Sequence, residues 1–186
     1  MKLQKIVSHL QKLHPKEIDL SLDRIKILCE KLGNPQEKIK AISVVGTNGK
    51  QSTINAIFSI LKESKLKCNV YTSPHIQKIN ERFVFNNNML NDDELIDLFE
   101  EVEKINDQNP LTFFEALSAC YFYKAAQYPD NINLIEAGLF HRFDATNILK
   151  NNLASIVCSI VKIILIGYQR INKLLKKLYL KKHPLF

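Results

Sequence analysis

The sequence lacks any uninterrupted apolar run long enough to span a bilayer, and its lysine-containing start lacks the apolar core of a secretory signal. Cysteine is scarce, and its four positions show no C-x-x-C spacing and no nearby histidine pair, which argues against a zinc site. The 46% hydrophobic content suits one globular domain with a real core. We therefore expect a cytoplasmic protein whose cysteines are reduced core thiols.

Acidic residues are absent from the end of the chain. Residues 161–186 contain seven Lys and Arg and no Asp or Glu, which accounts for the whole formal net charge of +7. The remaining 19 Lys and Arg balance the 19 Asp and Glu, so the rest of the chain is neutral. A general basic surface is not supported, and we expect no nucleic-acid partner.

Hydrophobic periodicity predicts alternating helices and strands. Apolar residues recur at helical spacing in 3–13, 21–32, 54–61, 91–105 and 113–126, with Ser21 and Asn91 as expected N-caps. Apolar and β-branched runs at 39–45, 68–72, 133–137 and 154–160 predict strands. This alternation predicts an α/β fold, in which a mostly parallel sheet is flanked by helices in three layers.

A glycine-containing loop lies between the first predicted strand and the helix that follows it. Residues 46–53 read GTNGKQST. Nucleotide binding needs backbone N–H groups at a helix N-terminus, a lysine that neutralises phosphate charge and a hydroxyl near magnesium. Lys50 would supply the cation, and Ser52 or Thr53 the hydroxyl. The alternative is a tight strand-to-helix turn with a surface lysine, but the flanking strand and helix favour a phosphate loop.

This short loop, GTNGK, resembles the ATP loop of the Mur-ligase superfamily. Four further blocks resemble the folylpolyglutamate synthase and dihydrofolate synthase branch, in that family's order: 13–22 with 32–35, 71–75, 112–115, and 136–139 with 142–147. The five blocks span roughly the first 160 residues. The resemblance implies that residues 1–160 form a P-loop ATP-binding domain, incomplete relative to the family, and that the protein is a monomer.

The resemblance also implies a reaction. Family enzymes transfer the γ-phosphate of ATP to a carboxylate on dihydropteroate or a folate, and the amine of L-glutamate then attacks the acyl phosphate. Such chemistry depends on charge neutralisation and positioning more than on a protein nucleophile. By the resemblance, Thr47, Asn48, Gly49, Lys50 and Ser52 bind ATP, and no residue beyond Lys50 is assigned to the chemical step.

Ser73 and Glu136 correspond to magnesium ligands of the family. Their oxygens suit Mg²⁺, which takes one or two protein ligands and completes its shell with phosphate and water. Glu136 ends an apolar run, at the carboxyl end of a predicted strand where open α/β sheets bind ligands. For Ser73, a plain Ser-Pro turn is an alternative.

Three segments fall on positions that contact the pterin substrate in the bacterial enzymes. An aromatic ring beside a carboxylate or amide suits a pterin, because the flat ring can stack while its edge is hydrogen-bonded. A competing interpretation is that Phe113 and Phe114, which open a helix, belong to the core. The segments comprise Glu17, Ile18, Asp19, Leu20, Thr112, Phe113, Phe114, Glu115, Phe143, Asp144 and Ala145.

Two departures from the family pattern bear on these sites. Gln51 stands where the family usually has glycine, which would cost about 1 kcal/mol if the position required positive φ. Because related ligases accept other residues there, we expect ATP binding to survive. Phe140 and His141 replace two glycines, and either reshape the substrate loop or leave His141 as an exposed loop side chain.

The resemblance stops after Ile160. A Leu-Asp-His block with another magnesium ligand, a Glu-Lys pair with a carbamylated lysine, and the C-terminal domain are all missing from the sequence. We hypothesise a frameshift there, because reading one base out of frame permits Lys-Asp-His-Thr-Asp-Trp-Leu-Pro across 162–169 and Phe-Glu-Lys across 180–182. Residues 161–186 would then be an out-of-frame basic tail, and we expect impaired or absent ligation. Sequencing the DNA decides this.

Two other interpretations remain open. The chain is a nucleotide-binding fragment without catalysis, or an unrelated P-loop protein whose tail lies on anionic membranes. The second rests on apolar residues at helical spacing among the lysines of 171–178. The five matched blocks weigh against it, so we expect no membrane partner.

Overall fold

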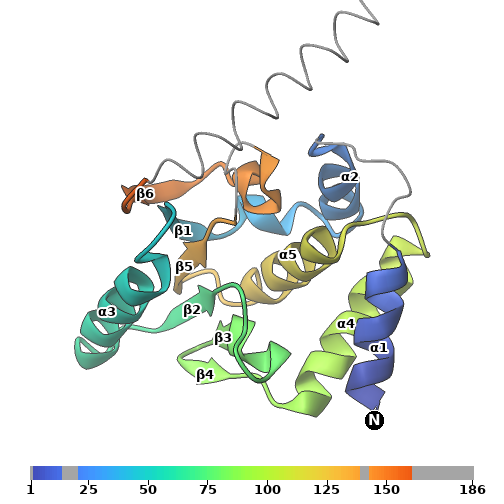
Figure 1. Cartoon of the computed structure of the whole chain (residues 1–186), viewed down its shortest axis with the longest axis horizontal. Helices are drawn as coiled ribbons and strands as arrows, with labels where there is room; N and C mark the ends of the chain where they lie inside the picture. The colour runs from blue at the N-terminus through green and yellow to red at the C-terminus, as the bar shows by residue number, and fades with distance from the viewer. Residues whose placement is uncertain (1, 14–20, 139–142, 161–186) are drawn as a thin grey trace, which may run out of the picture.

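The computed structural model describes residues 2–13, 21–138 and 143–160 (Figure 1). The expectations for the basic tail at 161–186 lie outside the described residues. The same holds for six further residues singled out above: Glu17, Ile18, Asp19, Leu20, Phe140 and His141.

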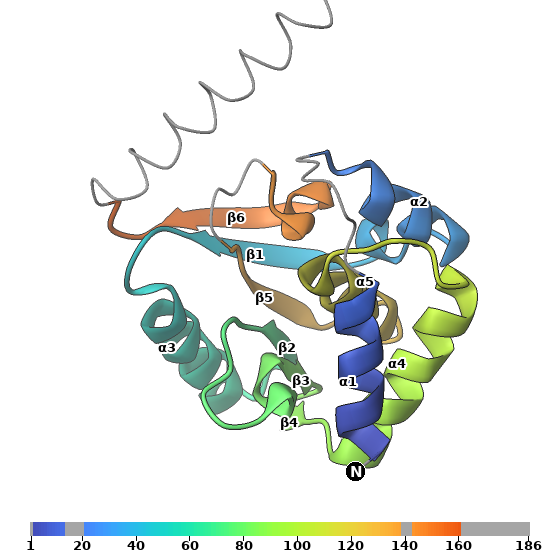
Figure 2. The ribbon, with the colours of Figure 1, turned by 45° about the vertical axis from the view of Figure 1, so that its right-hand side comes forward.

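Six strands form one sheet in the order β4-β3-β2-β5-β1-β6, with β6 and β4 at its two edges (Figure 2). The mostly parallel sheet confirms the predicted fold class. Its parallel strands are β1 (Lys40–Val45), β2 (Cys68–Tyr71), β5 (Ile132–Glu136) and β6 (Asn152–Val157).

An antiparallel hairpin, β3 (Phe83–Phe85) and β4 (Asn88–Met89), extends the sheet beyond β2 and was not predicted. Asn86 and Asn87 connect its strands with positive φ angles of 53° and 69°. Asparagine tolerates this conformation, which suits the tight turns of hairpins. The strands are too short for their alternation to be recognised, so the paired asparagines were the usable signal.

Helices cover both faces of the sheet, as the alternation predicts (Figures 1 and 2). One helix, α3 (Lys50–Glu63), covers what we call the α3 face, where buried Ile54 packs with Val44, Val70 and Leu134. The opposite, helix-rich face carries the larger core. Its helices are α1 (Lys2–Lys12), α2 (Asp23–Lys31), α4 (Asp92–Asn106) and α5 (Phe113–Ala125).

The helix starts follow local capping chemistry. Asn91 caps α4 as predicted, since its side chain accepts the Glu94 N–H and the Glu94 carboxylate accepts the Asn91 N–H. The N-cap prediction for Ser21 is wrong. Helix α2 begins at Asp23 with Leu22 at its N-cap, and the Asp23 N–H donates a long hydrogen bond of 3.4 Å to Ser21 Oγ.

All four cysteines are free thiols, and Cys29, Cys68 and Cys120 are buried as expected. Burial raises the pKa of the Cys29 thiol to about 12, which keeps it protonated. Cys158 is only half-buried, because it follows the edge strand β6 beside the loop at 46–49. Among the described residues, no helix combines the length and apolar character that crossing a bilayer requires.

Candidate active site

Three neighbouring parallel strands end at the same edge of the sheet, and each leads into a residue singled out from the sequence. Strand β1 leads into the loop at 46–49, β5 ends at Glu136, and β2 is followed by Ser73. The carboxyl ends of parallel strands are where open α/β sheets bind ligands. The fold therefore gathers the predicted phosphate loop and the two predicted metal ligands.

Glu136 lies at the centre of this group and is 3% exposed. Its Oε1 lies 3.5 Å from Lys50 Nζ, and its Oε2 accepts the Ser73 N–H at 2.9 Å. Leu134, two residues earlier, packs on the α3 face, so strand alternation directs Glu136 to that same face. One buried carboxylate thus joins all three strand ends.

The loop before α3 approaches the segment after β6 very closely. Gly46 has φ +142°, and a Cβ built there would lie 2.8 Å from the Cβ of Cys158, so only glycine fits. The Thr47 N–H donates to Ser159 O at 2.7 Å. Lys50 Nζ donates to the Gly46 carbonyl at 3.1 Å and lies 3.4 Å from the Thr47 carbonyl.

The remaining loop residues face solvent. Asn48, Gly49 and Ser52 are exposed, with Gly49 at the N-cap of α3 and Ser52 in its first turn. Gln51 lies within α3 and is not among the residues with positive φ, so the backbone strain considered for this position does not arise.

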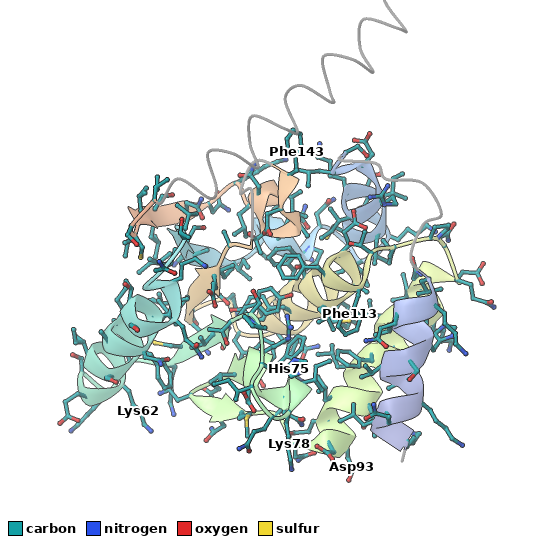
Figure 3. The ribbon with its side chains drawn as sticks, viewed as in Figure 1. Lys62, His75, Lys78, Asp93, Phe113 and Phe143 are labelled. Carbon is teal, nitrogen blue, oxygen red and sulfur yellow. The ribbon has the colours of Figure 1, made fainter. Side chains whose placement is uncertain are left out.

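A cavity of about 460 Å³ lies next to this group and is lined by Ser73. Six of the predicted substrate residues line it: Thr112, Phe114, Glu115, Phe143, Asp144 and Ala145. Phe113 does not, because it points toward a separate groove beside α1 and packs on the helix-rich core. Figure 3 labels Phe113 and Phe143. For Phe113, the core interpretation describes its position better.

Two of the lining residues are already engaged in local structure. Thr112 and Glu115 form the capping box of α5, with the Thr112 N–H donating to Glu115 Oε2 at 2.7 Å. The Glu115 carboxylate also receives Arg24 Nε at 3.1 Å and Nη2 at 3.2 Å. Arg24 also lines the cavity. Sequence reasoning missed it, because its partner lies 91 residues away.

Asp144 fixes the far wall of the cavity. Its Oδ2 accepts the Gly138 N–H at 2.9 Å, and its Oδ1 accepts the Thr146 N–H at 2.9 Å. A Cβ at position 138 would lie 2.3 Å from Asp144 Oδ2, so Gly138 is required for this approach. The carboxylate thereby ties the end of β5 to η4 (Ala145–Ile148).

The loop after β2 is held by two charged side chains that the sequence did not reveal. The Glu81 carboxylate accepts the N–H groups of Ile76, Gln77 and Lys78 at 2.7 to 2.9 Å, and these bonds lower the pKa of that carboxyl. Arg82 Nε donates to His75 Nδ1 at 2.9 Å, and Arg82 lines the cavity. The one sequence signal was a charged pair directly before the apolar strand β3.

The oxygen atoms near Lys50 fit a hard divalent cation. The Ser73 backbone N–H donates to Glu136 Oε2 at 2.9 Å, so the two residues that would supply oxygen ligands are neighbours. Within the described ranges, no group of three or more His, Cys, Asp or Glu side chains is placed to bind a metal. A two-residue oxygen set matches Mg²⁺, which retains water and phosphate ligands.

No family model matches the chain, but it is similar to curated proteins and to solved structures. A dihydrofolate synthase/folylpolyglutamate synthase of Haemophilus influenzae is 40% identical over 152 residues, which is 81% of this chain and 34% of that protein. FolC of Escherichia coli in complex with DHPP and ADP superposes with a TM-score of 0.78 at 32% identity, covering 86% of this chain and 38% of FolC.

A bifunctional folylpolyglutamate synthase/dihydrofolate synthase of Yersinia pestis complexed with AMPPNP and Mn gives a TM-score of 0.76 at 32% identity. That match covers 83% of this chain and 38% of the Yersinia chain. The chain is therefore homologous to the dihydrofolate synthase/folylpolyglutamate synthase family, and it spans about a third of the length of the curated relatives that it matches.

Proposed function

We propose that this chain binds ATP and a pterin-containing carboxylic acid, as part of a ligase that adds L-glutamate to dihydropteroate or a folate through an acyl phosphate. The observation that carries the proposal is the contact of buried Glu136 with both Lys50 and Ser73. Homologues with this activity and solved structures containing ADP or AMPPNP support it.

ATP would bind at the loop that precedes α3. Residues 47–50 bind the phosphates, and Lys50 leaves the loop carbonyls and Glu136 to neutralise phosphate charge. The exposed hydroxyl of Ser52 and the oxygens of Ser73 and Glu136 serve Mg²⁺ and its phosphates. When bound, the ion neutralises the charge that develops on the transferred phosphoryl group.

The pterin-containing substrate would bind in the cavity that Ser73 lines. Phe114 and Phe143 offer aromatic faces to the pterin ring, and Asp144 lies beside them. Ser73 lines the cavity and also contacts Glu136, so a carboxylate held there lies beside the phosphate-handling group. We further propose a cytoplasmic monomer whose ATP-binding domain ends near residue 160.

The proposal is tested by equilibrium titration of the chain with ADP and Mg²⁺. Lys50→Met should weaken binding about tenfold or more, because a charge-assisted contact to phosphate is lost. Lys62→Met is the matched control, since this exposed lysine lies in the last turn of the same helix (Figure 3). Equal affinity of Lys50→Met and wild type would overturn the assignment of the loop.

The alternative of nucleotide binding without catalysis is separated by a different measurement. Because the chain spans about a third of its relatives, binding and ligation are independent questions. ADP release that depends on both dihydropteroate and L-glutamate would identify ligation. Binding of ADP without such release would identify a binding fragment.

A further inference from the structure

Arg82 contributes a cation to the wall of the cavity, and no acidic side chain of the described residues forms an ion pair with it. It lines this cavity together with Ser73, Phe114 and Phe143. Its carbonyl accepts the Thr72 N–H at 3.4 Å, so its backbone runs alongside the residue that precedes Ser73. Arg82 therefore lines the cavity beside the segment that leads into Ser73.

The two arginines that the described residues contribute to the cavity differ in their partners. Arg24 is neutralised by Glu115, which accepts hydrogen bonds from two of its nitrogens. Arg82 makes one side-chain hydrogen bond, from Nε to the neutral acceptor His75 Nδ1, and forms no ion pair with any acidic residue of the described chain. Its two terminal NH₂ groups are thus available to an anion.

His75 holds this guanidinium in place. Because Nδ1 accepts the Arg82 Nε–H, the imidazole is neutral and carries its proton on Nε2. Glu81 in turn fixes residues 76–78 of the same loop. The Arg82 side chain is therefore held in position through its Nε atom.

We infer that Arg82 binds the reacting carboxylate of the substrate, and that His75 is a positioning residue that orients Arg82. This inference rests on the proposed function, because the carboxylate is the group that the ATP phosphoryl would join. A guanidinium presents two parallel N–H donors that match the two oxygens of a carboxylate. With the pterin against Phe114 and Phe143, the opposite end of the substrate would face Arg82.

The test compares dihydropteroate with its methyl ester, which retains the rings and lacks the negative charge. Arg82→Gln should weaken dihydropteroate binding about tenfold to a hundredfold and change ester binding less than about twofold. Arg82→Lys keeps the charge but lacks the two parallel N–H donors, so its affinity for dihydropteroate should lie between those of wild type and Arg82→Gln. Lys104→Gln is the control for net charge, since Lys104 is exposed near the end of α4.

The role of His75 is tested by rescue. His75→Ala should lose part of the dihydropteroate affinity, whereas His75→Asn should regain it, because the amide oxygen can replace Nδ1 as the acceptor. Ester binding should be unaffected in both variants. A purely structural role for His75 would weaken both ligands equally and would not be rescued by asparagine.

The possible outcomes distinguish an error in the role of Arg82 from an error in the pterin site. If wild type prefers dihydropteroate over the ester and Arg82→Gln keeps that preference, the inference about Arg82 is wrong and the proposed function stands. If wild type binds neither ligand, the pterin site itself is wrong. Circular dichroism of each variant shows whether a loss of affinity reflects loss of fold, and Arg82→Lys provides the test should Arg82→Gln fail to fold.

Discussion

The two faces of the sheet differ in their cores and in the predicted site residues that they carry. The helix-rich face buries large aromatic side chains, among them Phe83, Phe99 and Tyr121, beneath four helices. Of the helices in the described residues, one covers the α3 face, and its buried apolar cluster consists of aliphatic side chains around Ile54. The predicted phosphate loop and Glu136 lie on this thinner face. Stability and nucleotide handling are therefore expected to respond to different mutations.

The largest expected effect compares matched deletions on the two faces. Leu117→Ala on α5 should lower the free energy of unfolding by about 3–5 kcal/mol, and Ile54→Ala on α3 by about 2–3 kcal/mol. Both side chains are fully buried, but the neighbours of Ile54 include half-buried Ile57 and Phe58, which can close the cavity. Urea denaturation measures both. An equal or larger cost for Ile54→Ala would contradict the comparison.

A polar network on the helix-rich face comes next. Asn133 Oδ1 accepts from Asn69 Nδ2 at 3.0 Å and from the Tyr121 hydroxyl at 2.9 Å, and its Nδ2 donates to Lys40 O at 3.1 Å. Asn133→Ala should cost about 3 kcal/mol, because these buried groups lose their partner. The exposed Asn88→Ala is the control and should cost less than about 0.5 kcal/mol. A small cost for Asn133→Ala in thermal unfolding would show that the network rearranges.

On the α3 face, Gly46→Ala is expected to change the stability less than the substitutions above but to impair ADP binding strongly. Gly46→Ala should cost about 1–2 kcal/mol through its positive φ and overlap with Cys158, and should abolish ADP binding by displacing the loop. Gly33→Ala is the control, since Gly33 also has positive φ but its Cβ would meet only Lys38 Nζ at 3.7 Å. Retained ADP affinity in Gly46→Ala would show that the loop geometry tolerates a shift.

The smallest effect concerns Glu81, which lies outside both cores. Three backbone N–H groups lower the pKa of its carboxyl from the ordinary 4.5, so its stabilisation is complete above that unfolded value and is lost as pH falls through the lowered folded value. Glu81→Gln should therefore lower the melting temperature at neutral pH, and the difference from wild type should shrink in acid. A difference that is constant with pH would mean that the charge plays no part.

Sequence patterns predicted those features that depend on residues close together in the chain. Periodicity located the described helices and parallel strands within a few residues, and the capping pattern at Asn91 placed the start of α4. The loop at 46–50 and the carboxylate at the end of β5 were also visible, because both depend on a strand and the residues directly after it.

The missed features depend on contacts distant in sequence. Arg24 meets Glu115 across 91 residues, and Arg82 enters the cavity only because the unpredicted hairpin runs beside β2. Phe113 and Phe114 are adjacent in sequence but point to different hollows, a choice made by the packing of α5 against its neighbours. Helix propensity cannot tell which of two adjacent phenylalanines faces which cavity, because that depends on how the helices pack.

Strand alternation makes the spacing within β5 a functional quantity. Asn133 and Ile135 face the helix-rich core, while Leu134 and Glu136 face α3. Inserting one residue between Leu134 and Glu136 would turn the carboxylate away from Lys50 and direct it among the aromatic rings under α5. An insertion of two residues would restore the direction but move the carboxylate along the strand axis by about 7 Å. Evolution can thus vary the side chains of this strand far more freely than it can vary their number.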